Sequence, residues 1–423
     1  METRIPSYFE ILDGIGGDRV RRKLEYCQEL LKRSRTPLVF FERNEILQSL
    51  DLFRQHLPEV QPFYAVKANS DAFITQTLFE NGACFDVASG GEIEIMARRG
   101  VPGERMILAH PIKSLSTIQS AIRHRVKAYT FDNVDELIKL HGYFDKLKAD
   151  YRPASILRIE TQSEGVQVNL SEKFGAPPAD ALQLLARAKM LNLNPIGISF
   201  HVGCQSVDLS NYQRALEDVM TIFEAARKEL NLELHLVDIG GGFPIDTLLG
   251  KGTLGLENYF DDLREILAPL KGCTVIAEPG RVVAGPVCSI VTSIVGKSKR
   301  NGKNWLYLDD GVYGCYSGII FDHATFSYLP VHPKYHEDSY RGQLVPYVLA
   351  GPTCDSIDIV AREVYLPEDL EMGDKLVTTD IGAYSIASST EFNGFSARRI
   401  FYYDEAGQLD QSCLNDRRQA LAL

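Results

Sequence analysis

The chain has 423 residues, of which 45% are hydrophobic and 24% charged, a composition typical of a globular protein with a large core. Its net charge of −11 argues against nucleic acid and anionic membranes as partners, because both select a basic face. The amino-terminal stretch lacks an apolar signal core, and Glu278, Arg281 and two prolines interrupt the most apolar long stretch, residues 274–296. The eight cysteines lack CxxC and zinc-site spacing, so we expect no metal site and a cytoplasmic protein with reduced thiols.

Eight short apolar runs alternate with segments in which apolar residues recur every three or four positions, the pattern of strands alternating with amphipathic helices. An α/β fold in which eight strands are each followed by a helix is typical of a closed (β/α)8 TIM-like barrel. An open doubly wound sheet is the alternative, but no GxGxxG motif follows an early strand. The expected strands are 62–67, 84–89, 105–110, 127–132, 154–160, 196–203, 234–242 and 274–280.

After about residue 281 the pattern changes to β-type runs, and helical periodicity becomes scarce. Asn301-Gly302 between two such runs predicts a β-hairpin turn. We therefore expect a second, mostly antiparallel β domain. The predicted boundaries are 38–281 for the barrel, with 1–37 and 282–423 forming the β domain, although the strand-like run 38–42 precedes the eight barrel strands and could join the second domain.

Ionisable residues end many of the expected barrel strands. Lys67 directly follows the buried-looking run 62–66, and lysine is almost never fully buried unless it is paired. Any one strand-end residue could simply lie where the chain reaches water. Barrel enzymes, however, place their active sites at the carboxyl ends of the strands, so the set together predicts a site. Its members are Lys67, Asp86, His110, Asp132, Arg158, His201, glycines 240–242 and Glu278.

The run "DIGGGFP" ends the seventh expected strand, and "EPGR" ends the eighth. Glycines let backbone N–H groups approach an anion, and barrels often bind phosphate after strands 7 and 8, although a glycine run could also be a tight turn. An amine at Lys67, a phosphate cradle and the carboxylate of Glu278 suggest pyridoxal phosphate. The amine would form a Schiff base, and the carboxylate would keep the pyridine nitrogen protonated.

Six motifs resemble, in order, the signature series of the alanine-racemase-fold amino-acid decarboxylases, and most closely the ornithine decarboxylase group. They are "FYAVKAN", "SFHVG", "DIGGGFP", "AEPGR", "GPTCDSID" and "GAYSIAS…FNGF", spread over about residues 36–402. The resemblance implies pyridoxal-phosphate-dependent decarboxylation of L-ornithine to putrescine and carbon dioxide in polyamine biosynthesis. It also implies a homodimer with active sites at the subunit interface.

The resemblance assigns roles to matching positions. Lys67 would carry the Schiff base, Glu278 would bind the pyridine nitrogen, and His201 would stack on the ring. Cys354, reached from the partner subunit, would protonate the α-carbon after carbon dioxide leaves. Further cofactor-binding residues would be Asp86, Arg158, Cys204, Gly240, Gly241, Gly242, Gly280, Arg281 and Tyr384, and the substrate's distal amine would meet Asp322, Asp355 and Tyr313.

One position departs from the family pattern. Eukaryotic members typically have Ser after "FHVG", whereas this chain has Cys204 and then Gln205. Because a thiol is a weaker hydrogen-bond partner than a hydroxyl, the phosphate would rely on Ser206 or on backbone groups.

Three alternative functions remain open. Lysine differs from ornithine by one methylene, which is worth only ~1–3 kcal/mol of discrimination. Diaminopimelate decarboxylases usually have "GPxCES" where this chain has "GPTCDS", and an Asp-lined distal pocket does not suit their second carboxylate. A catalytically inactive homologue that binds a regulatory protein is disfavoured by the presence of Lys67, Glu278 and Cys354.

Overall fold

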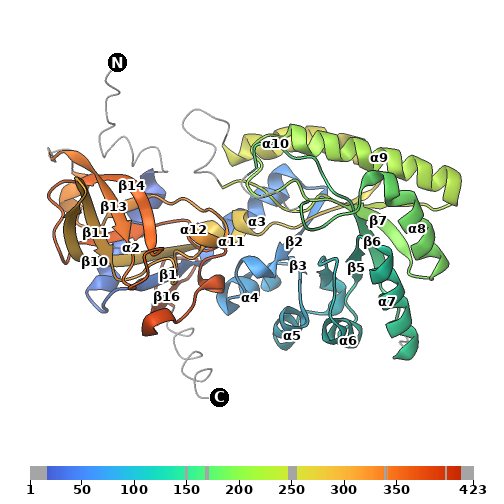
Figure 1. Cartoon of the computed structure of the whole chain (residues 1–423), viewed down its shortest axis with the longest axis horizontal. Coiled ribbons are helices and arrows are strands. Elements are labelled where there is room, and N and C mark those ends of the chain that lie inside the picture. Colours follow the sequence, from blue (N-terminus) through green and yellow to red (C-terminus); the bar gives the residue numbers. More distant parts are fainter. Residues whose placement is uncertain are drawn as a thin grey trace. The chain divides into compact units, whose positions relative to one another are not determined.

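The computed structural model describes residues 17–147, 151–166, 171–245, 255–337, 340, 342–395 and 398–410 (Figure 1). The chain divides into two compact units, one comprising Ile46–Leu249 and Thr253–Val283 and the other chiefly Met1–Glu45 and Ala284–Leu423. Within the described ranges, no helix is both long enough and apolar enough to cross a membrane.

The first unit contains a closed barrel of eight strands. Every neighbouring pair is parallel, and β9 closes the ring by pairing with β2. Each strand overlaps one of the apolar runs, so the expected (β/α)8 barrel is confirmed and the open sheet is wrong. The strands are β2 (Val60–Ala65), β3 (Cys84–Asp86), β4 (Met106–Leu108), β5 (Ala128–Phe131), β6 (Ala154–Arg158), β7 (Pro195–Ser199), β8 (Leu236–Asp238) and β9 (Thr274–Ala277).

Helices follow the strands and surround the barrel (Figure 1). Four of them begin at a residue whose side chain accepts a backbone N–H of the first turn: Asp71, Ser89, Ser114 and Asn133. Such caps satisfy donors that have no partner within the helix. The helices are α4 (Ala72–Glu80), α5 (Gly90–Arg98), α6 (Leu115–Arg123), α7 (Val134–Lys146), α8 (Ala181–Met190), α9 (Ser210–Leu230) and α10 (Leu256–Leu267).

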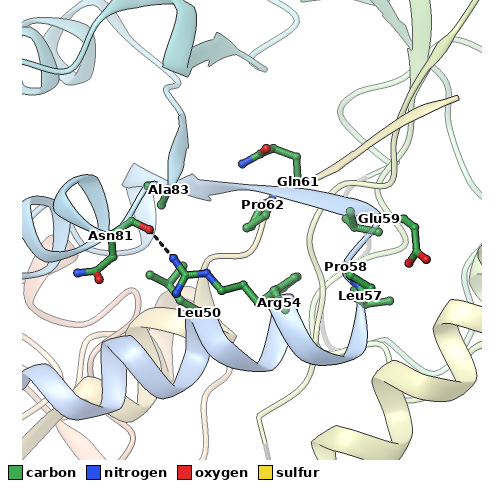
Figure 2. A pocket seen from close by; sticks show the side chains of 12 residues that line it. Leu50, Arg54, Leu57, Pro58, Glu59, Gln61, Pro62, Asn81 and Ala83 are labelled. Atoms are coloured by element: carbon green, nitrogen blue, oxygen red, sulfur yellow. Dashed lines mark hydrogen bonds between the residues drawn. The ribbon is translucent and has the colours of Figure 1, made fainter.

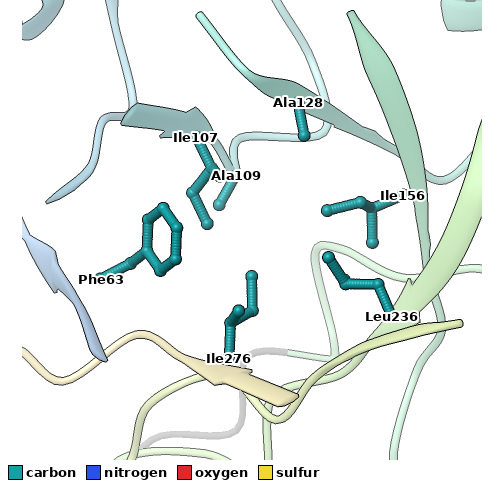
Figure 3. Packing of buried hydrophobic residues seen from close by; sticks show 7 residues of the cluster. All are labelled: Phe63, Ile107, Ala109, Ala128, Ile156, Leu236 and Ile276. Atoms are coloured by element: carbon teal, nitrogen blue, oxygen red, sulfur yellow. The ribbon is translucent and has the colours of Figure 1, made fainter. Parts of the chain in front are cut away.

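The inside of the barrel is filled by apolar side chains that point inward from different strands (Figure 3). Every second residue of a strand faces inward, so each strand can contribute side chains to this layer. Six of the strands do so. The barrel is therefore a solid core whose strand ends are held in fixed positions. The layer consists of Phe63, Ile107, Ala109, Ala128, Ile156, Leu236 and Ile276.

The second unit is built on a mostly antiparallel sheet, as expected. Its strand order is β12-β15-β10-β11-β13-β14, and β1 pairs with both β10 and β16. Among the strand pairs in the described part of this unit, β1–β16 and β11–β13 are parallel and the others are antiparallel. The strands are β1 (Leu38–Glu42), β10 (Cys288–Arg300), β11 (Lys303–Leu308), β12 (Tyr328–Pro330), β13 (Leu344–Ala350), β14 (Ile359–Pro367), β15 (Lys375–Thr378) and β16 (Arg399–Tyr403).

The predicted hairpin is confirmed, because β10 and β11 pair antiparallel up to Arg300 and Lys303. Asn301 and Gly302 form the turn with φ of 50° and 76°, the left-handed backbone that a two-residue hairpin turn requires. The other α-helices of the described residues are α2 (Gly17–Leu31), α3 (Arg43–His56), α11 (Arg281–Val287) and α12 (Gly318–Phe321).

Strand β1 is part of this second sheet, whereas the boundary at residue 38 assigned it to the barrel. Its last residue, Glu42, accepts a hydrogen bond from the buried Lys23 of α2. Arg19, also on α2, binds Glu45 at 2.9 Å and Asp380 at 2.7 Å. A buried ionic cluster therefore joins α2 to this sheet. The apolar pattern of the sequence gave no sign of it.

Candidate active site

Lys67 lies at the carboxyl end of β2. The last three residues of that strand are buried, and the chain continues as the 3-10 turn Val66–Ala68. Val66 and Ala68 are buried in this turn, which turns Lys67 outward, and its side chain is 46% exposed. The Nζ atom lies 3.8 Å from Oδ2 of Asp86 at the end of β3. The amine is thus anchored by a core strand but remains accessible.

Three carboxyl groups are buried at neighbouring strand ends. Burial and, to a smaller extent, the nearby Glu278 raise the pKa of Asp86 to about 7, although Lys67 and Arg158 oppose the rise. Burial and the adjacent carboxyl of Asp238 hold the pKa of Glu278 well above its usual range. Burial also raises the pKa of Asp238, to about 6. These groups favour a positively charged partner, whose presence would let them ionise.

Asp238 was missed as a site residue. It ends β8, is fully buried, and accepts the Gly240 N–H at 2.9 Å through Oδ1. An acidic residue at the end of an apolar strand, directly before a glycine run, was the available signal.

His201 follows β7 and carries a neutral imidazole. Burial, together with the positive charges of Arg158 and Lys67, holds its pKa well below the usual range. The Gly203 N–H donates to Nδ1 at 3.1 Å, and because a backbone N–H can only donate, the ring proton lies on Nε2. The ring is therefore fixed in one tautomer, and a neutral ring suits stacking on an aromatic ligand.

The glycines 240–242 allow three strand-end loops to pack together. A Cβ at Gly240 would lie 2.3 Å from the carbonyl oxygen of Phe200, and one at Gly241 would lie 2.6 Å from that of Glu278. At Gly242 the distance would be 2.1 Å to the carbonyl oxygen of Gly203, and φ there is +91°. These glycines are thus required for packing, whether or not they also contact a phosphate.

Cys204 and Arg281 share the electrostatic environment of Lys67. Burial raises the pKa of the Cys204 thiol, and Arg281 and Lys67 oppose that rise. Arg281 is buried and follows Gly280 as the first residue of α11. Ser206 is fully buried, and its hydroxyl already donates to the Asp208 carbonyl and accepts from the Asn211 amide. Arg281 is thus better suited than the Ser206 hydroxyl to bind a phosphate.

His110 and Asp132 support loops next to the strand ends. His110 accepts the Ile112 N–H at 3.2 Å, and Asp132 accepts the Gly175 N–H at 3.0 Å. These bonds account for both residues without a chemical role.

The remaining predicted residues belong to the second unit. The Tyr313 hydroxyl donates to Asp355 at 2.5 Å. This bond and the Ile357 N–H hold the pKa of Asp355 below its usual range, so that it is ionised. Cys354 is exposed and precedes Asp355 in the same loop. A thiol and an anionic carboxylate therefore occupy consecutive positions of one loop.

A buried aspartate that the sequence analysis missed builds this loop. Asp358 accepts the N–H of Val312 at 2.8 Å, and both the N–H and the hydroxyl of Thr353 at 3.0 and 2.7 Å. A Cβ at Gly311 or Gly351 would lie 2.2 Å from its carboxylate. The motif "GPTCDSID" thus contains its own anchor.

Asp322 and Tyr384 are held around α12. Asp322 is buried and caps the carboxyl end of that helix, with its N–H donating to Gly318 at 2.9 Å. Tyr384 has φ of 52°, and the Ser317 hydroxyl donates to the next carbonyl, that of Ser385, at 2.7 Å. Both side chains are thus carried by short, constrained segments.

A cavity of about 290 Å³ lies at the opposite ends of the strands (Figure 2). It is lined by the start of β2, by residues 81–83 before β3, and by α3. Arg54 reaches across it and donates to the Asn81 carbonyl at 2.6 Å (Figure 2). None of the predicted site residues lines this cavity, and barrels keep their chemistry at the other end.

Comparison with known proteins places the chain in a family. Residues 43–285 match the pyridoxal binding domain of the pyridoxal-dependent decarboxylases. A lysine/ornithine decarboxylase of Selenomonas ruminantium is 37% identical over 89% of this chain and 92% of its own length. Antizyme inhibitor 2 of Xenopus laevis is 36% identical over 83% of this chain and 79% of its own. The structure of SrLDC in complex with PLP and cadaverine has a TM-score of 0.79 and 34% identity, covering 93% and 96% of the two chains.

The chain belongs to the pyridoxal-dependent decarboxylase family, and its cofactor is pyridoxal phosphate. The barrel residues fit this cofactor. They provide an accessible amine at Lys67, buried carboxyls coupled to it, and a neutral ring at His201. When bound, pyridoxal phosphate acts as an electron sink for the carbanion left by loss of carbon dioxide.

Proposed function

We propose that this chain decarboxylates L-ornithine to putrescine and carbon dioxide, with L-lysine as a second substrate that yields cadaverine. The similarity to a lysine/ornithine decarboxylase over most of both chains supports this substrate class. So does an ionised carboxylate at Asp355, because a distal alkyl ammonium group needs an anionic partner. The products would enter polyamine biosynthesis.

In this proposal the barrel residues hold the cofactor. Lys67 attaches it covalently, Glu278 faces its ring nitrogen, and His201 covers the ring. Asp86 and Arg158 tune the charge of the same pocket. The phosphate would be bound by the backbone of glycines 240–242 and Gly280 and by the Arg281 guanidinium, with Cys204 at its edge; Tyr384, which belongs to the second unit, would be a further phosphate ligand.

The second unit supplies the residues that act on the substrate. Cys354 donates its proton to the substrate's α-carbon, and Asp355, Asp322 and Tyr313 recognise the distal ammonium group. We further propose a homodimer in which Cys354 and Asp355 serve the barrel of the partner subunit. The exposure of Cys354 in the single chain supports this arrangement.

One observation carries the proposal: the amine of Lys67 is coupled to the buried carboxyls of Asp86 and Glu278. Buried carboxyls with raised pKa values at the strand ends of a barrel are costly for stability and are typical of a site that receives a charged ligand. A purely structural role does not require them.

The substrate is tested by measuring kcat/KM for L-ornithine, L-lysine, L-arginine and diaminopimelate side by side on the purified enzyme. We expect ornithine to be best, with lysine within about 200-fold, because a single methylene discriminates weakly. A preference for arginine or diaminopimelate would contradict the assignment.

An inactive homologue is the second candidate, favoured by the 36% identity to antizyme inhibitor 2. The active decarboxylase and the inactive homologue can be distinguished by absorbance. Protein purified with added pyridoxal phosphate should show a visible band if the cofactor is attached to a lysine. A band that appears on addition and disappears in Lys67→Ala supports the enzyme. The absence of any band supports the inactive homologue.

A further inference from the structure

We propose that Asn393 is a positioning residue that holds the thiol of Cys354 in its proton-donating form. This inference rests on the proposed role of Cys354 as the donor to the substrate's α-carbon. It assigns a specific task to the "FNGF" motif, which contains Asn393 and to which none of the roles described above applies.

A single oxygen atom of Asn393 contacts Cys354 twice. The Cys354 N–H donates to Oδ1 at 3.3 Å, and the Cys354 Sγ lies 3.4 Å from the same atom. Because a backbone N–H can only donate, the amide of Asn393 must present its oxygen. The sulfur contact is therefore a thiol donating its proton to Oδ1.

The backbone of Asn393 suits this task. Its φ of 54° is left-handed, a conformation that asparagine and glycine adopt more readily than other residues. The preceding Phe392 stacks on Tyr313 with ring centroids 4.3 Å apart, and the Thr390 N–H donates to the Tyr313 carbonyl at 2.8 Å. The segment that carries Asn393 is thus held in place by the contacts of its neighbours Phe392 and Thr390 with Tyr313.

Tyr313 connects the segment of Asn393 to the segment of Cys354. Its ring holds Phe392, and its hydroxyl holds Asp355, the neighbour of Cys354. The thiol is therefore placed between two segments that share one tyrosine. Such a support shell is what keeps a reacting group within the small tolerance that proton transfer to carbon requires.

The contact also affects the proton itself. In the transfer, the S–H bond of Cys354 breaks as a C–H bond forms on the substrate, and the thiolate later regains a proton from water. An oxygen acceptor 3.4 Å from the sulfur stabilises the thiol and disfavours the thiolate. Asn393 therefore keeps the donor protonated between turnovers and holds the thiol in place until the substrate's α-carbon takes its proton.

The test uses Asn393→Gly in the full-length holoenzyme, because glycine keeps the left-handed backbone and removes only the amide. Alkylation of Cys354 is followed against pH by peptide mass spectrometry. We expect its midpoint to fall by about 0.5–1 pH unit, the effect of losing one hydrogen bond to the neutral form. Looser packing would change the plateau rate but leave the midpoint in place. Asn301→Gly, the same change at a left-handed turn between β10 and β11, is the matched control and should shift nothing.

A second readout is the fraction of turnovers in which the α-carbon of the substrate is protonated and the diamine forms. In the other turnovers the proton goes to a different atom. We expect this fraction to fall in Asn393→Gly in the same direction as in Cys354→Ala. Asn393→Asp, which keeps the acceptor but adds a charge, should raise the alkylation midpoint and provides the test if the glycine variant does not fold.

The possible failures are distinguishable. If Cys354→Ala changes the product fraction while both Asn393 variants leave the midpoint and the product fraction unchanged, the positioning role is wrong. If the midpoint shifts but neither Cys354→Ala nor Asn393→Gly changes the product fraction, the proposed donor role of Cys354 is wrong.

Discussion

At the scale of single residues, Lys67 and Asp86 lie 3.8 Å apart, one exposed and the other buried. That difference sets their behaviour. The amine remains accessible for chemistry, while the carboxyl responds to its burial and to Glu278 with a raised pKa. The ionisation state of each group in this site therefore depends on its burial as much as on its residue type.

Replacing Lys67 with alanine should abolish the visible absorbance of bound cofactor and reduce kcat by at least about 10³-fold, because the attachment point and its charge are lost. Absorbance spectra and steady-state assays measure both effects. Lys127→Ala, which removes an exposed lysine just before β5, should leave both unchanged. A lysine other than Lys67 carrying the cofactor would contradict the placement.

The pKa of Asp86 makes a prediction about stability in the cofactor-free protein. The pKa of this carboxyl is about 7 in the folded protein, against 3.8 for an unperturbed aspartate, so the folded state binds the extra proton between these two pH values. Stability therefore falls as pH rises from about 4 to about 7. Asp86→Asn should reduce the fall between about pH 5 and pH 8 by about 1–3 kcal/mol, or a few degrees in Tm.

Thermal unfolding at the two pH values measures this difference. Asp262→Asn on α10 changes the same formal charge at an exposed position and should keep the wild-type fall. An equally steep fall in Asp86→Asn would show that another group causes it.

At the scale of elements, loops are held by buried polar anchors rather than by apolar packing. Asp358 ties the segment of Thr353 to that of Val312, and Gly311 leaves room for its carboxylate. At the barrel the buried anchor is Asp238, which accepts the Gly240 N–H, and the absence of a side chain at Gly240 and Gly242 lets the neighbouring loops touch. Each anchor lies next to a proposed site residue.

Gly311→Ala should lower stability by about 1–3 kcal/mol, because its Cβ would lie 2.2 Å from the Asp358 carboxylate. It should also lower kcat, since the loop that carries Cys354 depends on that carboxylate. Gly142→Ala in the exposed middle of α7 meets no atom within 4 Å and should raise stability by about 0.5–1 kcal/mol. Equal Tm values for the two variants would refute the anchor.

At the scale of the whole molecule, the proposed residues are divided between two compact units. Lys67 and Glu278 belong to the barrel unit, and Cys354 and Asp355 belong to the β unit. A homodimer in which one chain supplies the β-unit residues of the other's site is therefore the assembly to test.

Mixing inactive variants tests that assembly. Lys67→Ala and Cys354→Ala are each expected to be inactive in forming putrescine. After random exchange of subunits, half of the dimers are mixed, and one of their two sites is intact, so about a quarter of wild-type activity should return. Mixing Lys67→Ala with Glu278→Gln, both in the barrel, should restore none. If the first mixture also remains inactive although exchange is shown by mass spectrometry, shared sites are excluded.

The sequence by itself determined the barrel, the second sheet and the family. Strand and helix periods are local, so the eight apolar runs and the Asn301-Gly302 turn could be recognised without tertiary information. The strand ends, including Lys67 and Glu278, followed from the same pattern.

Only the tertiary structure revealed which groups touch. Asp238, Asp358 and Asn393 lie far in sequence from several of the residues they contact or affect, and β1 pairs with strands more than 200 residues away. Burial, which sets the pKa values of Asp86 and Glu278, depends on the packing of the whole chain. Local patterns carry no record of these contacts, because hydrogen bonds and desolvation depend on distance in space rather than position in the chain.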